Sequence, residues 1–139
     1  MTDTNIFLPA LAMTGLTFIV WLRMYFMRVA EMKRERIDPQ AVATSPQMAA
    51  MLKDTRAADN FRNLFELPVL FYLALTVAAM SGQATTLVLA LAWLFVALHV
   101  LHSAIHCGYN KVMHRFQAYL AGGIVLWILW GVIGFGLVR

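Results

Sequence analysis

The sequence predicts an all-α integral membrane protein, a bundle of four transmembrane helices forming a single domain over residues 1–139. The first observation is the composition, since 61% of the 139 residues are hydrophobic and 13% are charged, against about 25% charged residues in a soluble domain. The second is that the apolar residues gather in four stretches, at about 7–29, 56–80, 86–105 and 116–137. Each stretch is close to the roughly 20 residues of helix that cross a bilayer, and the short connections favour antiparallel neighbours.

The first predicted span, 7–29, follows a short N-terminal segment that holds Asp3 but no lysine or arginine. A secretory signal would need a basic segment there, so we expect a membrane helix instead. Arg23 and Arg28 lie near the far end of this span. A long arginine side chain can extend toward the interface and keep its charge in water. This interpretation suits Arg28 better than Arg23, which lies more than a turn deeper.

Residues 30–55 form the one properly polar segment and separate the first two spans. The segment begins with the charged run at 31–36 and contains the Asp38-Pro39 and Ser45-Pro46 pairs. Such residues indicate a helix end followed by turns. We expect a long loop here, with a short amphipathic helix at about 47–52 leading into the second span.

The second predicted span, 56–80, opens with an unusual concentration of polar residues. Polar groups at membrane depth are costly and are usually kept for a function. On a continuous helix three of them, Arg62, Asn63 and Glu66, fall on one arc, because positions three and four apart are neighbours. The polar residues of this stretch are Arg56, Asp59, Asn60, Arg62, Asn63 and Glu66.

The third and fourth predicted spans, 86–105 and 116–137, bring further polar groups to the same depth. Four residues of the third span and its end share a helical stripe at spacings i, i+3, i+7 and i+10. Arg115 and Tyr119 begin the fourth span at the same level. Arginine, amide, carboxylate and imidazole groups are therefore expected to meet at one end of the bundle. The stripe consists of His99, His102, His106 and Tyr109.

The basic residues predict the orientation of the bundle. Of the eleven lysines and arginines, all except Arg139 lie at span ends that meet the loops 30–55 and 107–115. The positive-inside rule then places both termini outside and both long loops in the cytoplasm, and we expect a bacterial inner membrane. The net charge is +4 with no basic stripe along a polar face, so no nucleic-acid partner is expected. The single cysteine, Cys107, excludes an intrachain disulfide.

The residues alone leave several interpretations of this polar constellation open. The groups could simply bridge helices, at about 0.6–2 kcal/mol per contact. A metal site is not predicted, because His102 and His106 lack a clear third ligand beyond Glu66. A cation pathway through Glu66 is disfavoured by the surrounding positive groups. A polar, anionic ligand from the cytoplasm is the remaining interpretation: arginines would bind its carboxylates through forked hydrogen bonds, and a hydrophobic co-substrate would arrive from the lipid.

Two sets of residues resemble the MAPEG family, the membrane-associated proteins in eicosanoid and glutathione metabolism. The set Arg62-Asn63-x-x-Glu66, followed closely by Pro68, resembles the family signature of the second span. The second set resembles the series found in the branch of microsomal prostaglandin E synthases and glutathione transferases. It consists of His102, His106, Arg115 and Tyr119. With the length and four spans, the resemblance covers essentially the whole chain.

The resemblance implies a homotrimer embedded in membrane lipid that binds glutathione as a cosubstrate between neighbouring subunits near the cytoplasmic face. Arg115 stands where the family places the arginine that stabilises the thiolate. A thiol with a pKa of about 8.5 is mostly protonated at neutral pH, and a guanidinium favours the nucleophilic thiolate. Further residues would position glutathione, and one of them, Arg23, would reach it from the next subunit. They are Arg23, Arg62, Asn63, Glu66, His102, His106 and Tyr119.

The function predicted on this basis is glutathione-dependent conjugation or reduction of lipophilic electrophiles or hydroperoxides, as in a microsomal-type transferase or peroxidase. Two other classes stay open: a non-catalytic scaffold or lipid-binding protein of the same fold, and a small four-span transporter. The sequence also leaves open the rotation of the second span, because the register Arg56-x-x-x-Asn60 would turn Asn60 rather than Asn63 toward the site.

Overall fold

The computed structural model describes residues 3–139, with side chains from residue 5, and every regular element within that range is a helix. Six α-helices and two short 3-10 helices follow one another along the chain. They are η1 (Asp3–Phe7), α1 (Leu8–Arg34), η2 (Pro39–Val42), α2 (Ser45–Met51), α3 (Arg56–Asn63), α4 (Leu67–Met80), α5 (Thr86–Cys107) and α6 (Val112–Leu137).

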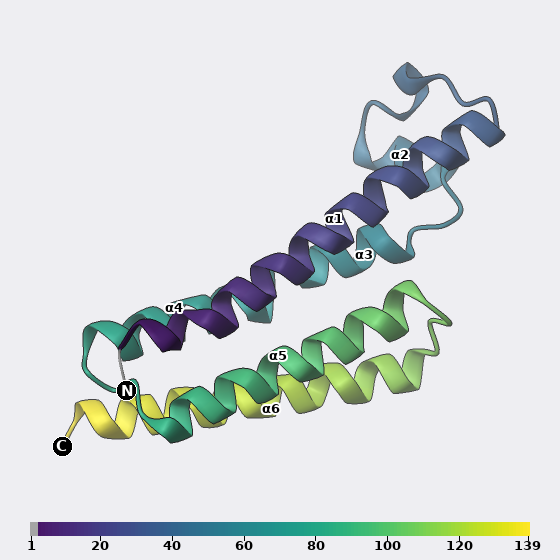
Figure 1. Ribbon diagram of the computed structural model, residues 1–139. Helices are drawn as coiled ribbons and strands as arrows, with labels where there is room; N and C mark the ends of the chain where they lie inside the picture. The colour runs from purple at the N-terminus through teal and green to yellow at the C-terminus, as the bar shows by residue number, and fades with distance from the viewer. Residues whose placement is uncertain (1–2) are drawn as a thin grey trace.

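The long helices lie side by side in an elongated bundle (Figure 1). α1 runs antiparallel to the α3–α4 pair, and α5 and α6 form a hairpin along them, so the two termini lie at one end. Four segments are long and apolar enough to cross a membrane: Asn5–Arg34, Arg56–Met80, Thr86–Cys107 and Val112–Leu137. The prediction of an all-α protein with four helical segments long and apolar enough to cross a membrane is confirmed.

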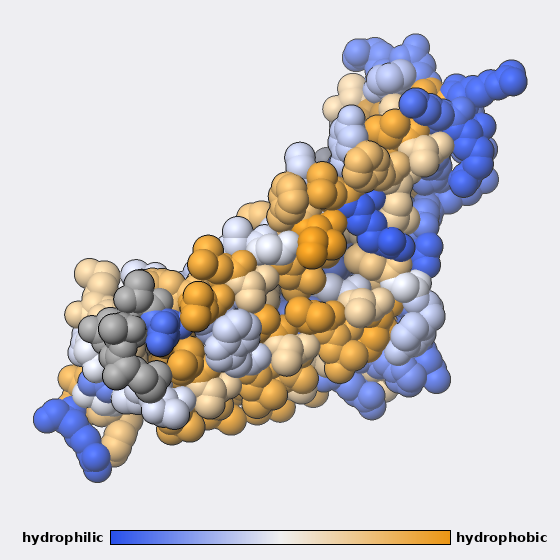
Figure 2. Space-filling model, viewed as in Figure 1, coloured by the Kyte–Doolittle hydropathy of each residue, from blue (hydrophilic) through white to orange (hydrophobic). Residues whose placement is uncertain are grey.

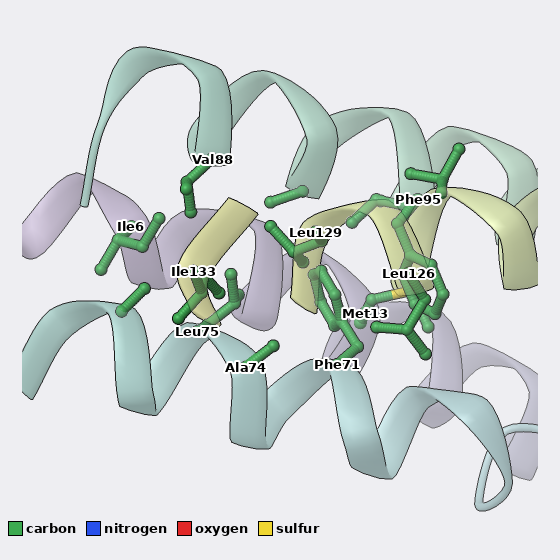
Figure 3. Close-up of a cluster of buried hydrophobic side chains, with 14 of the residues drawn as sticks. Ile6, Met13, Phe71, Ala74, Leu75, Val88, Phe95, Leu126, Leu129 and Ile133 are labelled. Carbon is green, nitrogen blue, oxygen red and sulfur yellow. The ribbon is translucent and has the colours of Figure 1, made fainter. Parts of the chain in front are cut away.

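Apolar side chains from all four spans meet in the middle of the bundle (Figure 3). Phe71 of α4 stacks on Phe95 of α5 with ring centroids 4.4 Å apart. Met13 of α1 and Leu126 of α6 pack in the same cluster. All four are fully buried. Because lipid tails are as apolar as these side chains, close packing rather than exclusion from water holds such helices together.

The outer surface divides into an apolar middle and a polar end. Figure 2 shows hydrophobic residues along the length of the bundle and hydrophilic residues around α2, its flanking loop and the turn between α5 and α6. Large apolar side chains on this surface are widely exposed, which suits contact with hydrocarbon rather than water. Examples are Leu11, Ile19, Phe26 and Trp127.

The second span is not the continuous helix that the sequence predicted. α3 ends at Asn63 and α4 begins at Leu67, with the amides of Phe65 and Glu66 bonded three residues back, to Arg62 and Asn63. Pro68 explains the break: it has no N–H for the carbonyl four residues earlier, and its ring would clash with that carbonyl. Glu66 therefore does not share one helical arc with Arg62 and Asn63, and that expectation is corrected.

The histidine stripe also ends earlier than predicted. α5 stops at Cys107, and the Gly108 N–H closes it by donating to the carbonyls of Ala104 and Ile105 at 3.0 and 3.3 Å. A Cβ on Gly108 would lie 2.7 Å from the Ala104 oxygen, so only glycine fits this helix end. Tyr109 consequently lies outside the helix, where its hydroxyl bonds His114 at 2.9 Å.

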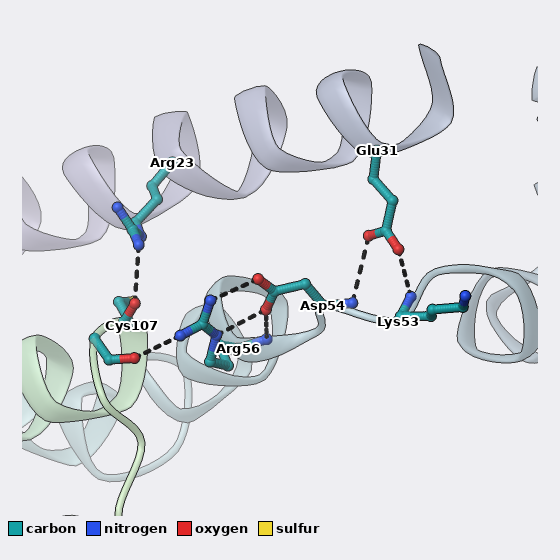
Figure 4. Close-up of polar contacts among 7 residues, drawn as sticks. Arg23, Glu31, Lys53, Asp54, Arg56 and Cys107 are labelled. Carbon is teal, nitrogen blue, oxygen red and sulfur yellow. Dashed lines mark hydrogen bonds and ion pairs between the residues drawn. The ribbon is translucent and has the colours of Figure 1, made fainter. Parts of the chain in front are cut away.

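Buried and bidentate polar contacts attach the loop between α1 and α3 to the bundle (Figure 4). The Glu31 carboxylate of α1 is buried and accepts the Lys53 and Asp54 amides at 2.7 and 3.4 Å. Arg56 donates to both carboxylate oxygens of Asp54, at 2.9 and 2.7 Å, and to the Gly108 carbonyl. The Arg56 guanidinium lowers the pKa of Asp54 below its usual value. The start of α3 is thereby fixed to α1 and to the turn after α5.

Candidate functional site

A pocket of about 210 Å³ lies at the polar end of the bundle, between the α3–α4 break, α5 and the start of α6. The break places the end of α3 and the start of α4 on one wall, and the other helices supply the opposite wall. Five of its seven lining residues are ones that the sequence predicted for a ligand site. The lining consists of Asn63, Glu66, His102, Val112, Arg115, Phe116 and Tyr119.

Glu66 and Tyr119 form one contact between the two walls of this pocket. The Tyr119 hydroxyl of α6 donates to Glu66 Oε2 at 2.7 Å, which joins α6 to the residue just before α4. A hydroxyl bonded to an ionised carboxylate is among the stronger hydrogen bonds in proteins. The pair fixes the carboxylate at the mouth of the pocket, where it can accept from an ammonium or amide group.

Asn63 and His102 form a second contact between these walls. His102 of α5 is buried, and its Nδ1 lies 3.0 Å from the carbonyl oxygen of Arg115. Its Nε2 lies 3.4 Å from the amide nitrogen of Asn63. His102 thus spans two helices and turns one ring nitrogen toward the pocket.

Arg115 supplies the positive charge of the pocket, and Asn110 holds its side chain. The half-buried Arg115 guanidinium donates through Nη1 to Asn110 Oδ1 at 2.8 Å. Asn110 has a φ of 51°, in the left-handed region that asparagine tolerates better than most residues. Sequence reasoning missed Asn110. A signal existed, because an asparagine soon after a helix-ending glycine is typical of a tight turn.

Three of the predicted site residues do not line this pocket in the single chain, and Arg62 is the first. Its side chain is 78% exposed and lies 3.9 Å from Asp59. Together with Arg28, Met24 and Phe65 it lines a separate hollow between α1 and α3. Arg62 and Asn63 are consecutive in α3 and point about 100° apart around its axis, and the break at 64–66 separates Arg62 from Glu66.

Arg23 contacts the end of α5 rather than the pocket. Its Nη2 donates to the Cys107 carbonyl at 2.9 Å, close to the contact of Arg56 with Gly108 (Figure 4). Cations at a helix C-terminus satisfy free carbonyls and interact favourably with the helix dipole. Within one chain Arg23 therefore caps α5.

His106 lies behind His102, one turn further along α5. Its ring is buried and meets the His102 ring edge-on, with centroids 5.5 Å apart. It supports the pocket residue without lining the pocket itself.

The structure distinguishes Asn60 from Asn63, a choice that the sequence left open. Asn60 is fully buried between α3 and α5, where it accepts from the Ser103 hydroxyl at 3.3 Å and donates to Cys107 Sγ at 3.6 Å. Asn63 faces the pocket. Sequence reasoning missed Ser103 and the contact with Cys107, because they depend on the rotation of α3 about its axis.

The comparisons with known proteins bear on the whole chain. No curated protein and no solved structure gives a significant match. A family model, described as the MAPEG family, matches residues 6–135. The match covers nearly the whole of the four spans and includes every residue that lines the pocket. The chain therefore belongs to the MAPEG family.

Proposed function

We propose that this protein is a glutathione-dependent membrane enzyme that conjugates or reduces lipophilic electrophiles or hydroperoxides. The MAPEG family includes glutathione-dependent membrane enzymes. The observation that carries the proposal is the pocket itself, which joins one guanidinium, one carboxylate, an amide and an imidazole at the polar end of the bundle. These groups match a zwitterionic tripeptide that carries carboxylates, an ammonium group and one thiol.

Each polar residue of the pocket has a role in this proposal. Arg115 lies beside the sulfur and stabilises the thiolate, since an adjacent cation lowers the pKa of a thiol. Glu66 accepts from the ammonium group. Asn63 and Tyr119 hold the peptide by hydrogen bonds. The thiolate then attacks an acceptor that reaches the pocket from the bilayer.

The volume of the pocket supports a site shared between copies of the chain. One protomer supplies about 210 Å³, whereas ligand pockets usually measure about 300–1,000 Å³. A neighbouring subunit in a homotrimer would supply the remaining wall, and its Arg23 or Arg62 would supply further positive charge. Native mass spectrometry of the solubilised protein checks this. Three chains per particle would support the proposal, and a monomer that still binds glutathione would contradict it.

The predicted orientation fits the same proposal. Both termini would lie outside, and the pocket, with the loop between α1 and α3, would face the cytoplasm of a bacterial inner membrane. Glutathione would then enter from the cytoplasm, and the lipophilic acceptor would enter from the surrounding hydrocarbon.

Thermal unfolding in detergent, with and without millimolar glutathione, tests the proposal. A ligand present at about 100 times its Kd raises the free energy of unfolding by about 2.7 kcal/mol. We expect a clear increase in Tm for the unaltered protein and none for Arg115→Ala. Arg139→Ala is the matched control, because Arg139 packs on Phe135 at the opposite end of the bundle, 4.4 Å from the ring centroid. No glutathione effect in the unaltered protein would favour a non-catalytic scaffold, whereas Glu66-dependent counterflow in liposomes would favour a transporter.

A further inference from the structure

We propose that His102 is the catalytic base that takes the thiol proton, with its side chain held in the required tautomer by the backbone of Arg115. This inference rests on the proposed function and assigns one step of it to one atom, His102 Nε2. Arg115 stabilises the product of that step, the thiolate, but a guanidinium is always protonated and accepts no proton. A separate acceptor is therefore needed.

The tautomer of His102 follows from its contacts. Nδ1 lies 3.0 Å from the Arg115 carbonyl oxygen. A carbonyl oxygen only accepts hydrogen bonds, so the proton of a neutral His102 resides on Nδ1 and Nε2 carries the lone pair. The amide nitrogen of Asn63 lies 3.4 Å from Nε2. This nitrogen is a hydrogen-bond donor, which agrees with an Nε2 that carries no proton and can accept. This distance is long for a hydrogen bond, so a thiol can replace the amide.

The position of His102 is equally specific. The Nδ1 bond crosses from α5 to α6 and attaches the imidazole to the backbone of Arg115, the residue that carries the pocket's positive charge. His102 is buried, with 2% of its surface exposed, and it is one of the seven residues that line the pocket. The imidazole is thus fixed to the backbone of Arg115, while Asn110 holds the guanidinium of the same residue at 2.8 Å.

The other lining residues are poorer acceptors. Asn63 and Phe116 have no basic atom, and the Tyr119 hydroxyl already donates to Glu66. Glu66 Oε2 already accepts the Tyr119 hydroxyl at 2.7 Å, whereas the lone pair of His102 Nε2 faces the Asn63 amide nitrogen at the longer distance of 3.4 Å. A histidine imidazole is also the group that most often serves as a general base in enzymes.

The step balances without any further reagent. The S–H bond of glutathione breaks, its electron pair remains on sulfur, and the proton forms an N–H bond at His102 Nε2. The thiolate then attacks the electrophilic atom of the acceptor, whose leaving group departs with the electron pair of the broken bond. The imidazolium returns its proton to that leaving group or to water, which regenerates the neutral tautomer.

Two charged groups line the pocket together with His102: the Glu66 carboxylate, just before α4, and the Arg115 guanidinium of α6. The neighbouring rings on α5 and α6 lie within 6.4 Å between centroids. They belong to His99, His106 and Tyr119.

The test combines a matched variant with a count of protons. His102→Asn keeps an N–H near the position of Nδ1, and hence the bond to the Arg115 carbonyl, but has no counterpart of Nε2. Bound thiolate is measured by its ultraviolet absorbance. The protons released on binding are measured by calorimetry in two buffers of different ionisation enthalpy. His114→Asn is the control, since His114 lies outside the pocket and bonds Tyr109.

We expect the unaltered protein to form thiolate with almost no proton released, because His102 retains it. His102→Asn should release one proton for each thiolate formed, and its kcat/KM at neutral pH should fall about 100-fold or more and recover partly at higher pH. Equal proton release and equal activity in both proteins would overturn the role of His102 and leave the proposed function intact. Absence of bound thiolate in the unaltered protein would overturn both.

Discussion

The side chains in and behind the pocket are placed by hydrogen bonds and close packing. Arg115 is held by Asn110 at 2.8 Å, and His102 by the Arg115 carbonyl at 3.0 Å. Behind them, His99 packs on Phe95, with ring centroids 4.1 Å apart, and bonds its carbonyl at 3.2 Å. The space for the His99 ring exists because residue 122 of α6 is glycine.

Gly122→Ala should destabilise the protein by about 1–3 kcal/mol, the usual cost of overpacking a core. A Cβ at this position would lie 3.0 Å from His99 Cε1 and 3.2 Å from Nδ1, so the buried ring would have to move. Gly131→Ala in the same helix meets nothing within 4 Å and should be neutral or stabilising by up to about 1 kcal/mol. Thermal unfolding of both variants in detergent compares them. Equal Tm values for the two would show that residue 122 is not tightly packed.

At the scale of elements, the sequence predicts the number and position of the helices, which depend on composition. It does not predict the break in the second span, which depends on one residue. Four apolar stretches of spanning length were enough to place four helices, because a bilayer permits little else. The apolar stretch 56–80 predicts a single helix, whereas Pro68 divides it into α3 and α4. A continuous helix would place Arg62, Asn63 and Glu66 on one face, and the break removes that relation. The rotation that separates Asn60 from Asn63 could not be read from spacing alone.

Pro68→Ala should let α3 and α4 join into one helix and thereby disturb the pocket. Alanine restores the N–H that can donate to the Leu64 carbonyl and removes the ring that clashes there. We expect slower hydrogen exchange over residues 64–68 and weaker glutathione binding, without loss of thermal stability. Pro46→Ala is the matched control, because Pro46 also lies in the first turn of a helix, α2, away from the pocket. Unchanged exchange and unchanged binding would exclude Pro68 as the cause of the break.

The loop before α3 should lose one of its attachments in acid. Arg56 lowers the pKa of Asp54, so the carboxylate stabilises the fold above its unfolded-state pKa of about 3.9, and this stabilisation is lost as the pH falls through the lower folded-state value. Asp54→Asn should therefore cost about 0.2–1 kcal/mol near neutral pH. The difference from the unaltered protein should vanish in strong acid. Thermal unfolding across this range measures it, and a difference independent of pH would contradict the ion-pair explanation.

On the scale of the whole molecule, chemistry is concentrated at one end of an otherwise apolar bundle. The termini lie at the other end (Figure 1), and the surface between is hydrophobic (Figure 2). The sequence predicted this polarity correctly, since it follows from where charges interrupt apolar stretches. It could not show which of the polar residues meet, because that depends on helix rotation and on the break in the second span. Asn63, Glu66, His102, Arg115 and Tyr119 do meet.

Conjugation of glutathione to a generic aromatic halide by the purified protein tests the central claim most directly. The account predicts glutathione-dependent product formation by the unaltered protein and by Arg139→Ala. It predicts a loss of about 100-fold or more in kcat/KM for Arg115→Ala, as expected when a group that stabilises developing charge is removed. Product formation at the same rate by Arg115→Ala would contradict the account, because the thiolate would then be formed outside the pocket that Arg115 lines.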